Sequence, residues 1–207
     1  DRSISNALGS ERSVEIPFTC DSILKYCTEG MDVLEVGGVP TDSSHYFSIN
    51  SALQKSECNY SVCDFRGGEY VGDFVTLDFG DKKFDVIMFI SSLEHFPQCT
   101  EGDMEFREGE DKKGYAKALS LLNKGGKIIL TVPFGKPVWQ SYHQNYNWDK
   151  LLDLTEGSEV IEAHTYVLED ESDTWNLTDP EDMEDICYTH KAYGVGCFVL
   201  EGESNGT

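Results

Sequence analysis

Apolar residues occur along this chain in short runs, and segments with the periodicity of an amphipathic helix separate them. The apolar runs predict strands, at residues 32–36, 59–63, 74–77, 84–90, 127–132, 160–168 and 196–200. The periodic segments predict helices, at residues 20–27, 44–55, 115–122 and 147–154. Strands that alternate with helices in this order favour an α/β fold, with a mostly parallel sheet and helices on both faces.

Two further segments are polar and acidic, and they predict loops. Residues 97–113 separate a strand from a helix, and residues 169–193 form an acidic flap or loop that carries Trp175 between the last two strands. Residues 1–30 form a lead-in to the first strand. The length of 207 residues suits a single domain, residues 1–207, with a core of ordinary size.

The first predicted strand ends at the paired glycines Gly37 and Gly38. Such a turn lets backbone N–H groups approach a nucleotide-type ligand, because glycine has no Cβ to block the approach. A tight turn without a ligand has the same pattern. In a parallel sheet the carboxyl ends of the strands share one rim, so Gly37, Asp64, Asp73 and Ser91 should lie near one another.

The net charge bears on the expected binding partners, and the cysteine content bears on the cellular compartment. The formal net charge of −22 repels phosphate backbones, so nucleic acid is not an expected partner; a solvated acidic surface explains the charge equally well. The seven cysteines include no Cys-x-x-Cys pair, which favours reduced thiols and a cytoplasmic protein. We find no metal-ligand spacing, no run long enough for a membrane span and no secretory signal.

Four motifs follow one another in a fixed order between Met31 and Gly135. They are the segment VLEVGG, the segments GDF, LDF and FDVI, the segment SLEH, and the segment LLNKGGKIILTVP, at residues 33–38, 72–87, 92–95 and 121–133. Together they resemble class I S-adenosylmethionine-dependent methyltransferases. The resemblance implies a Rossmann-like, doubly wound sheet with an antiparallel last strand. Residues 108–111, 132–135 and 142–146 are similar to methyltransferases associated with bacterial glycan and polysaccharide gene clusters.

The resemblance implies a cofactor site for S-adenosylmethionine, with S-adenosylhomocysteine as product. Its residues are Glu35, Gly37, Gly38, Asp64, Phe65, Asp73, Phe74, Ile90 and Ser91. Asp64 would accept from the ribose hydroxyls and Asp73 from the adenine amine, because carboxylates accept such donors. Phe65 or Phe74 could pack on adenine. Asp64 could instead form a turn, Glu35 could be an exposed strand-end carboxylate, and either aromatic could belong to the core.

The binding site for the methyl acceptor is expected in the segments that follow the strands at residues 84–90 and 127–132. His95 is a candidate general base, since the unperturbed pKa of histidine lies near neutrality. It could equally orient its loop by hydrogen bonds. His143 is a second catalytic candidate, and Tyr142, Tyr146 and Trp175 are candidates for acceptor binding; exposed aromatic loops would explain the same residues. Val39 and Pro40 depart from the family's glycine motif, which puts cofactor binding in question.

The resulting hypothesis is methyl transfer to a glycan or small-molecule acceptor, with a hydroxyl oxygen as the preferred target. Methylation of a carboxylate is the alternative reaction. A non-catalytic binding protein on a degenerate methyltransferase fold and a nicotinamide-dependent oxidoreductase are the rival classes. The sequence leaves the acceptor and the oligomeric state open.

Overall fold

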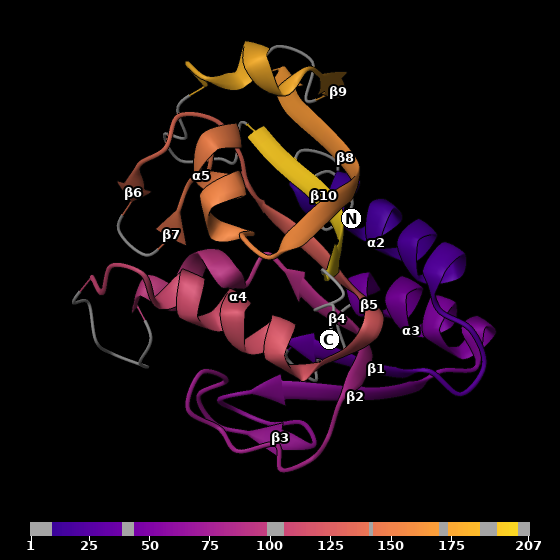
Figure 1. Ribbon diagram of the computed structural model, residues 1–207. Helices are drawn as coiled ribbons and strands as arrows, with labels where there is room; N and C mark the ends of the chain where they lie inside the picture. The colour runs from indigo at the N-terminus through magenta and orange to yellow at the C-terminus, as the bar shows by residue number, and fades with distance from the viewer. Residues whose placement is uncertain are drawn as a thin grey trace.

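The computed structural model describes residues 10–38, 44–98, 106–140, 143–169, 174–186 and 194–202. These residues form one eight-stranded sheet with helices on both faces, and a separate two-stranded hairpin that follows the fifth of its parallel strands in the chain (Figure 1). The helices are α2 (Arg12–Tyr26), α3 (Ser44–Ser56), η1 (Leu93–Gln98), α4 (Glu110–Leu121), α5 (Trp148–Leu154) and η2 (Pro180–Met183). The strands are β1 (Asp32–Val36), β2 (Asn59–Asp64), β3 (Tyr70–Val71), β4 (Phe84–Ile90), β5 (Leu122–Pro133), β6 (Trp139–Gln140), β7 (His143–Gln144), β8 (Ser158–Glu169), β9 (Thr174–Thr178) and β10 (Gly194–Gly202).

The sheet order is β3-β2-β1-β4-β5-β10-β8-β9. The first five of these strands run parallel, β10 is antiparallel to both β5 and β8, and β9 is antiparallel to β8. The order reverses between β1 and β4, which is the switch point where α/β sheets bind ligands. The prediction of a mostly parallel sheet with helices on both faces and an antiparallel end is confirmed.

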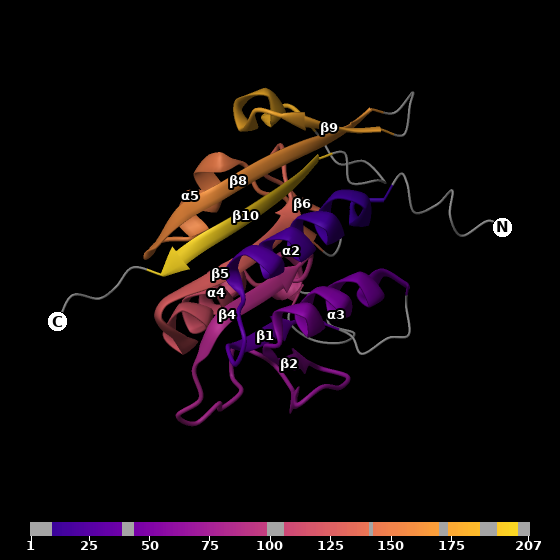
Figure 2. The same ribbon diagram turned by 90° about the vertical axis from the view of Figure 1, so that its right-hand side faces the viewer.

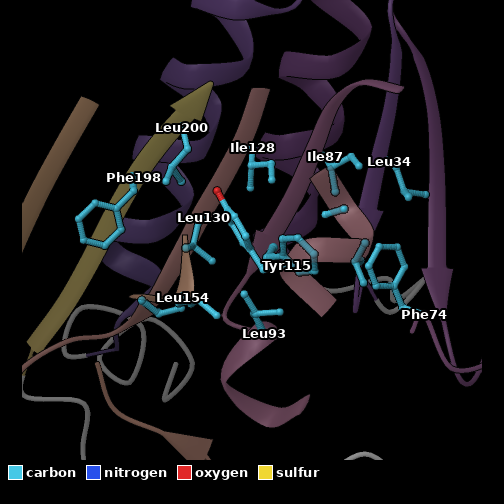
Figure 3. Packing of buried hydrophobic residues seen from close by; sticks show 14 of the residues in the cluster. Leu34, Phe74, Ile87, Leu93, Tyr115, Ile128, Leu130, Leu154, Phe198 and Leu200 are labelled. Carbon is cyan, nitrogen blue, oxygen red and sulfur yellow. The ribbon is translucent and has the colours of Figure 1, made fainter. Parts of the chain in front are cut away.

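Each central strand sends alternate side chains into two separate cores. On one face, Leu34 and Ile87 pack with residues of α4 and α5, among them Tyr115 and Leu154 (Figure 3). On the other face, Val33 and neighbouring strand residues pack against α2 and α3, which lie side by side over the sheet in Figure 2. Both faces of β4 are therefore buried, as its apolar sequence requires.

One predicted strand is a turn in the structure. Residues 74–77 form a turn instead of a strand, because Asp73 accepts from the N–H of Val75 through its side chain and from the N–H of Leu77 through its carbonyl. This local aspartate bonding outweighs the strand preference of the apolar residues that follow. The strand beside β2 is instead the two-residue β3.

The prediction of an acidic loop or flap is wrong for residues 174–178. They form the edge strand β9, and Trp175 of this strand pairs with Leu168 of β8. Helix α2 also extends well before the predicted segment 20–27. Its pattern is hidden because polar residues, Glu15, Thr19 and Ser22, occupy the buried face. Within the described part of the chain, no helix is long and apolar enough to cross a membrane.

Candidate functional site

The turn after β1 is closely packed against the segment that follows β4. Gly37 has a φ of 82°, and its N–H donates to the carbonyl of Cys63 at 2.8 Å. A Cβ on Gly37 would lie 2.5 Å from Cβ of Ser92, whose hydroxyl donates to the carbonyl of Val36. Both the backbone angle and the contact demand glycine, so this turn is held in one position at the switch point.

Glu35 is buried against this turn, with an exposed fraction of 1%. The hydroxyl of Tyr60 donates to its carboxylate, and burial raises the pKa of Glu35. The reading of Glu35 as an exposed strand-end carboxylate is therefore wrong. Its side chain occupies the space that a Cβ on Gly38 would need, so the carboxyl group supports the glycine turn from within the protein.

The two carboxylates predicted for the cofactor lie near one another at the end of β2. The N–H of Gly72, next to Asp73, donates to the carbonyl of Asp64 at 3.1 Å. Asp64 accepts from the N–H of Arg66 with one side-chain oxygen, and Asp73 accepts likewise from Val75. Asp64 therefore does form a turn. A carboxylate has further acceptor capacity, so this bond leaves a role toward a ribose or an amine chemically open.

The two aromatic candidates for adenine have different environments. The ring of Phe74 is 3% exposed and packs against Phe79 and Phe89, with ring centroids 5.7 and 5.8 Å apart. Phe74 therefore belongs to the core, and the structure does not support its role as a cofactor contact. Phe65 is 48% exposed beside Asp64 and remains available to a ligand. Ile90, at the end of β4, is buried.

Sequence reasoning missed a buried polar network at the start of α2. Glu15 is fully buried and accepts from Thr131 Oγ1 at 2.8 Å and from the hydroxyl of Ser91. Arg12 contacts Glu15 at 3.1 Å and donates to the carbonyl of Ile90 at 3.4 Å. Burial raises the pKa of Glu15. The network ties α2 to the ends of β4 and β5; its one signal in the sequence is the i, i+3 spacing of Arg12 and Glu15.

Beyond Ser91, the short helix η1 brings together His95 and His143. Their ring centroids lie 6.3 Å apart, at a near-perpendicular angle. The side chain of His95 is 45% exposed, whereas His143 is buried. Burial, with a smaller contribution from His95, lowers the pKa of His143 to about 4. His143 is therefore neutral near pH 7 and is the weaker candidate for a general base.

Two further acceptor candidates, Tyr146 and Trp175, do not join these histidines at a surface. Tyr146 is fully buried, and its hydroxyl donates to Asp111 at 2.9 Å, so it supports the core and is not exposed to an acceptor. Trp175 packs against the α2 side of the sheet. Three strands lie between its strand β9 and β4, a separation of about 19 Å at the usual strand spacing. Tyr142, Val39 and Pro40 lie outside the described residues.

Among the described residues, no group of three or more histidine, cysteine, aspartate or glutamate side chains could hold a metal ion. The residues at the switch point do fit a nucleoside ligand of the expected kind. A turn that requires glycine provides close backbone approach, and Asp64 and Phe65 provide an acceptor and an exposed aromatic ring next to it.

No protein-family model and no curated protein sequence matches the chain. Among solved structures, it is similar to a candidate methyltransferase from Bacillus halodurans C-125, with 15% identity, a TM-score of 0.55, and coverage of 89% of this chain and 99% of that one. It is similar to an S-adenosylmethionine-dependent methyltransferase from Clostridium acetobutylicum ATCC 824, with 12% identity, a TM-score of 0.55, and coverage of 99% and 96%. It is also similar to the 4+2 cyclase SpnF, with 12% identity, a TM-score of 0.50, and coverage of 90% and 80%.

At these identities the likeness concerns the fold and carries no activity from one chain to another. Two of the three structures are described as methyltransferases, and the strand order around the switch point agrees with the motifs in the sequence. The chain therefore has the Rossmann-like fold of class I S-adenosylmethionine-dependent methyltransferases.

Proposed function

We propose that the chain is an S-adenosylmethionine-dependent methyltransferase that methylates a hydroxyl oxygen of a glycan or a small molecule. The observation that carries the proposal is the Gly37–Gly38 turn, held at the switch point of a methyltransferase fold between buried Glu35 and Ser92. A turn fixed from both sides presents its backbone to a ligand without reorganising, which favours binding.

In this proposal the rim residues divide into two groups. Gly37, Gly38 and Asp64 hold the cofactor, with Asp73 and Phe65 near the adenine. S-adenosylmethionine supplies a methyl group that is electrophilic because of its sulfonium charge. His95 accepts the proton of the acceptor hydroxyl, because its imidazole is half-exposed at the end of β4. Orientation of the acceptor and exclusion of water remain the main tasks of the protein.

The choice of oxygen rests on the need for a base, since a hydroxyl must lose its proton and a carboxylate need not. A carboxylate acceptor would make His95 dispensable, so the two reactions differ in their dependence on that residue. The experiment supplies S-adenosylmethionine with a 13C-labelled methyl group and offers a nucleotide sugar, a phenol, an aliphatic carboxylic acid and an amine. Mass spectrometry then identifies any labelled product. We expect label on a hydroxyl substrate, and we expect His95→Gln to reduce it at least about tenfold.

The fold is not restricted to methyltransferases, since it also occurs in the cyclase SpnF. The rival is a non-catalytic binding protein on this fold, which would bind S-adenosylmethionine without transferring its methyl group. Retention of S-adenosylmethionine with no labelled product from any acceptor class, including extracts of the source organism, would favour this rival.

A further inference from the structure

Glu94 is a buried carboxyl group between the cofactor rim and the two histidines. It lies in η1, with an exposed fraction of 2%, and its Oε1 lies 3.8 Å from Nε2 of His95. The other oxygen, Oε2, is buried without a hydrogen-bond partner among the described residues. Burial of an unsatisfied carboxyl oxygen is costly, so the fold alone gives no reason to place a glutamate here.

The charged and titratable groups that face Glu94 come from several elements. Helix α2 contributes Arg12 and Glu15, η1 contributes His95, and Tyr146 precedes α5. The ring of His143 in β7 lies 6.3 Å from that of His95. Burial outweighs the favourable effects of His95 and Arg12 and raises the pKa of Glu94 to about 7. Near neutral pH the carboxyl group can therefore be protonated or ionised at little cost.

We propose that Glu94 is a positioning residue for His95: it holds the imidazole at the rim and stabilises the imidazolium that forms when His95 takes a proton. This inference rests on the proposed function in that the proton comes from an acceptor hydroxyl. In the step, the O–H bond breaks, the proton moves to an imidazole nitrogen, and the electron pair stays on the acceptor oxygen. The exposed imidazolium then passes the proton to water, which restores the pair.

The chain offers a matched control for this pair. Glu162 Oε1 lies 3.3 Å from Nε2 of His164, but both side chains are partly exposed on β8. Lys25 and Tyr26 donate to the other carboxylate oxygen of Glu162. A carboxylate in water contributes less to a neighbouring charge than one that is buried. The same glutamate-to-glutamine change can therefore be made at a buried carboxyl–imidazole pair and at an exposed one.

The test is NMR titration of protein with 13C-labelled histidine, in the absence of any ligand. The sequence has five histidines, and His95→Gln assigns the His95 signal. Because the charges of Glu94 and His95 stabilise one another, we expect Glu94→Gln to move the His95 titration curve to lower pH and to leave the His164 curve unchanged. We expect Glu162→Gln to leave the His95 curve unchanged. An unchanged His95 midpoint in folded Glu94→Gln would overturn the proposal.

A second measurement keeps the proposal testable if Glu94→Gln does not fold. In the parent protein the pH dependence of the His95 signal should depart from a one-proton curve, because the neighbouring carboxyl group of Glu94 ionises near pH 7. A one-proton curve would contradict the coupling. These titrations need no cofactor, so their failure is distinct from a failure to bind S-adenosylmethionine. Calorimetry on the same samples with S-adenosylhomocysteine measures cofactor binding separately.

Discussion

Gly38 lies directly against the carboxyl group of Glu35: a Cβ atom on Gly38 would lie 2.7 Å from Cδ of Glu35 and 2.9 Å from its Oε1. The hydroxyl of Tyr60 holds Glu35 from the other side, and the residue is buried, so it has little room to move. Glycine is thus needed at this position because of a specific neighbour, in addition to any need of a ligand.

Gly38→Ala should therefore disturb the turn and weaken binding of S-adenosylhomocysteine at least about tenfold, equivalent to ~1.4 kcal/mol. The affinity is measured by calorimetry. Gly30→Ala is the control: Gly30 has a φ of 78°, but a Cβ there would meet nothing within 4 Å. That variant should lose some stability from backbone strain and keep its affinity. Equal affinities for Gly38→Ala and the parent would show that the turn is not part of the cofactor site.

Asp64→Ala and Asp73→Ala should each weaken S-adenosylhomocysteine binding by about 1–3 kcal/mol, as expected for loss of a hydrogen bond to a charged group. Both residues also hold turns, so the control must share that feature. Asp78 accepts from the N–H of Gly80 at 2.8 Å in the same way. Asp78→Ala should therefore lower stability similarly without changing affinity. If all three variants bind like the parent, the assignment of Asp64 and Asp73 is wrong.

The buried network around Glu15 should contribute to stability. Thr131→Val keeps the shape of the side chain but removes the donor to Glu15, which leaves a buried carboxylate less satisfied. We expect a loss of about 1–2 kcal/mol in the free energy of unfolding, measured in urea. Ser120→Ala is the control, because that hydroxyl is exposed on α4 and bonds to its own helix. A loss no larger than the control's would show that Thr131 does not hold α2 to the sheet.

His143 should make stability depend on pH. In the folded protein its pKa is lowered to about 4, whereas an unfolded chain has the ordinary value of 6.5. Between these values the unfolded state binds the extra proton, so the stabilising contribution is present above about pH 6.5 and is lost as the pH falls toward 4.

His143→Asn lacks this titration. The advantage of the parent over the variant in unfolding free energy should shrink by up to about 2–3 kcal/mol between pH 7.5 and pH 4.5. Urea unfolding at a series of pH values measures it. Curves for parent and variant that run parallel would contradict a lowered pKa for His143.

The sequence predicted the elements whose signals are local and strong. Strand β4 is a run of apolar residues with both faces buried, and β1 ends at a glycine pair, so their bounds agree with the structure. The turn at Asp73 and the strand β9 were misread because short segments of mixed character depend on partners that are distant in sequence. Residues 174–178 can be recognised as a strand only when their pairing with β8 is known.

In the candidate site, too, local signals predicted some residues, whereas others depend on tertiary packing. The positions of Gly37 and Asp64 followed from strand ends, which the sequence marks clearly. The exposure of Phe65 and Phe74 depends on how the turns before and after β3 pack, and the sequence does not indicate that packing. The buried carboxyl groups of Glu15 and Glu94 could not be predicted, because a charged residue in a helix is usually solvated. Only the tertiary contacts show that these two are not.

If the proposed function is right, the switch point binds S-adenosylmethionine. Isothermal titration calorimetry of the parent protein with S-adenosylmethionine, S-adenosylhomocysteine and NAD measures this binding. We expect saturable binding of the first two ligands at one site per chain, and no binding of NAD. A folded protein that gives no binding heat and no thermal stabilisation with either adenosyl ligand at millimolar concentration, or that binds NAD instead, would contradict the account.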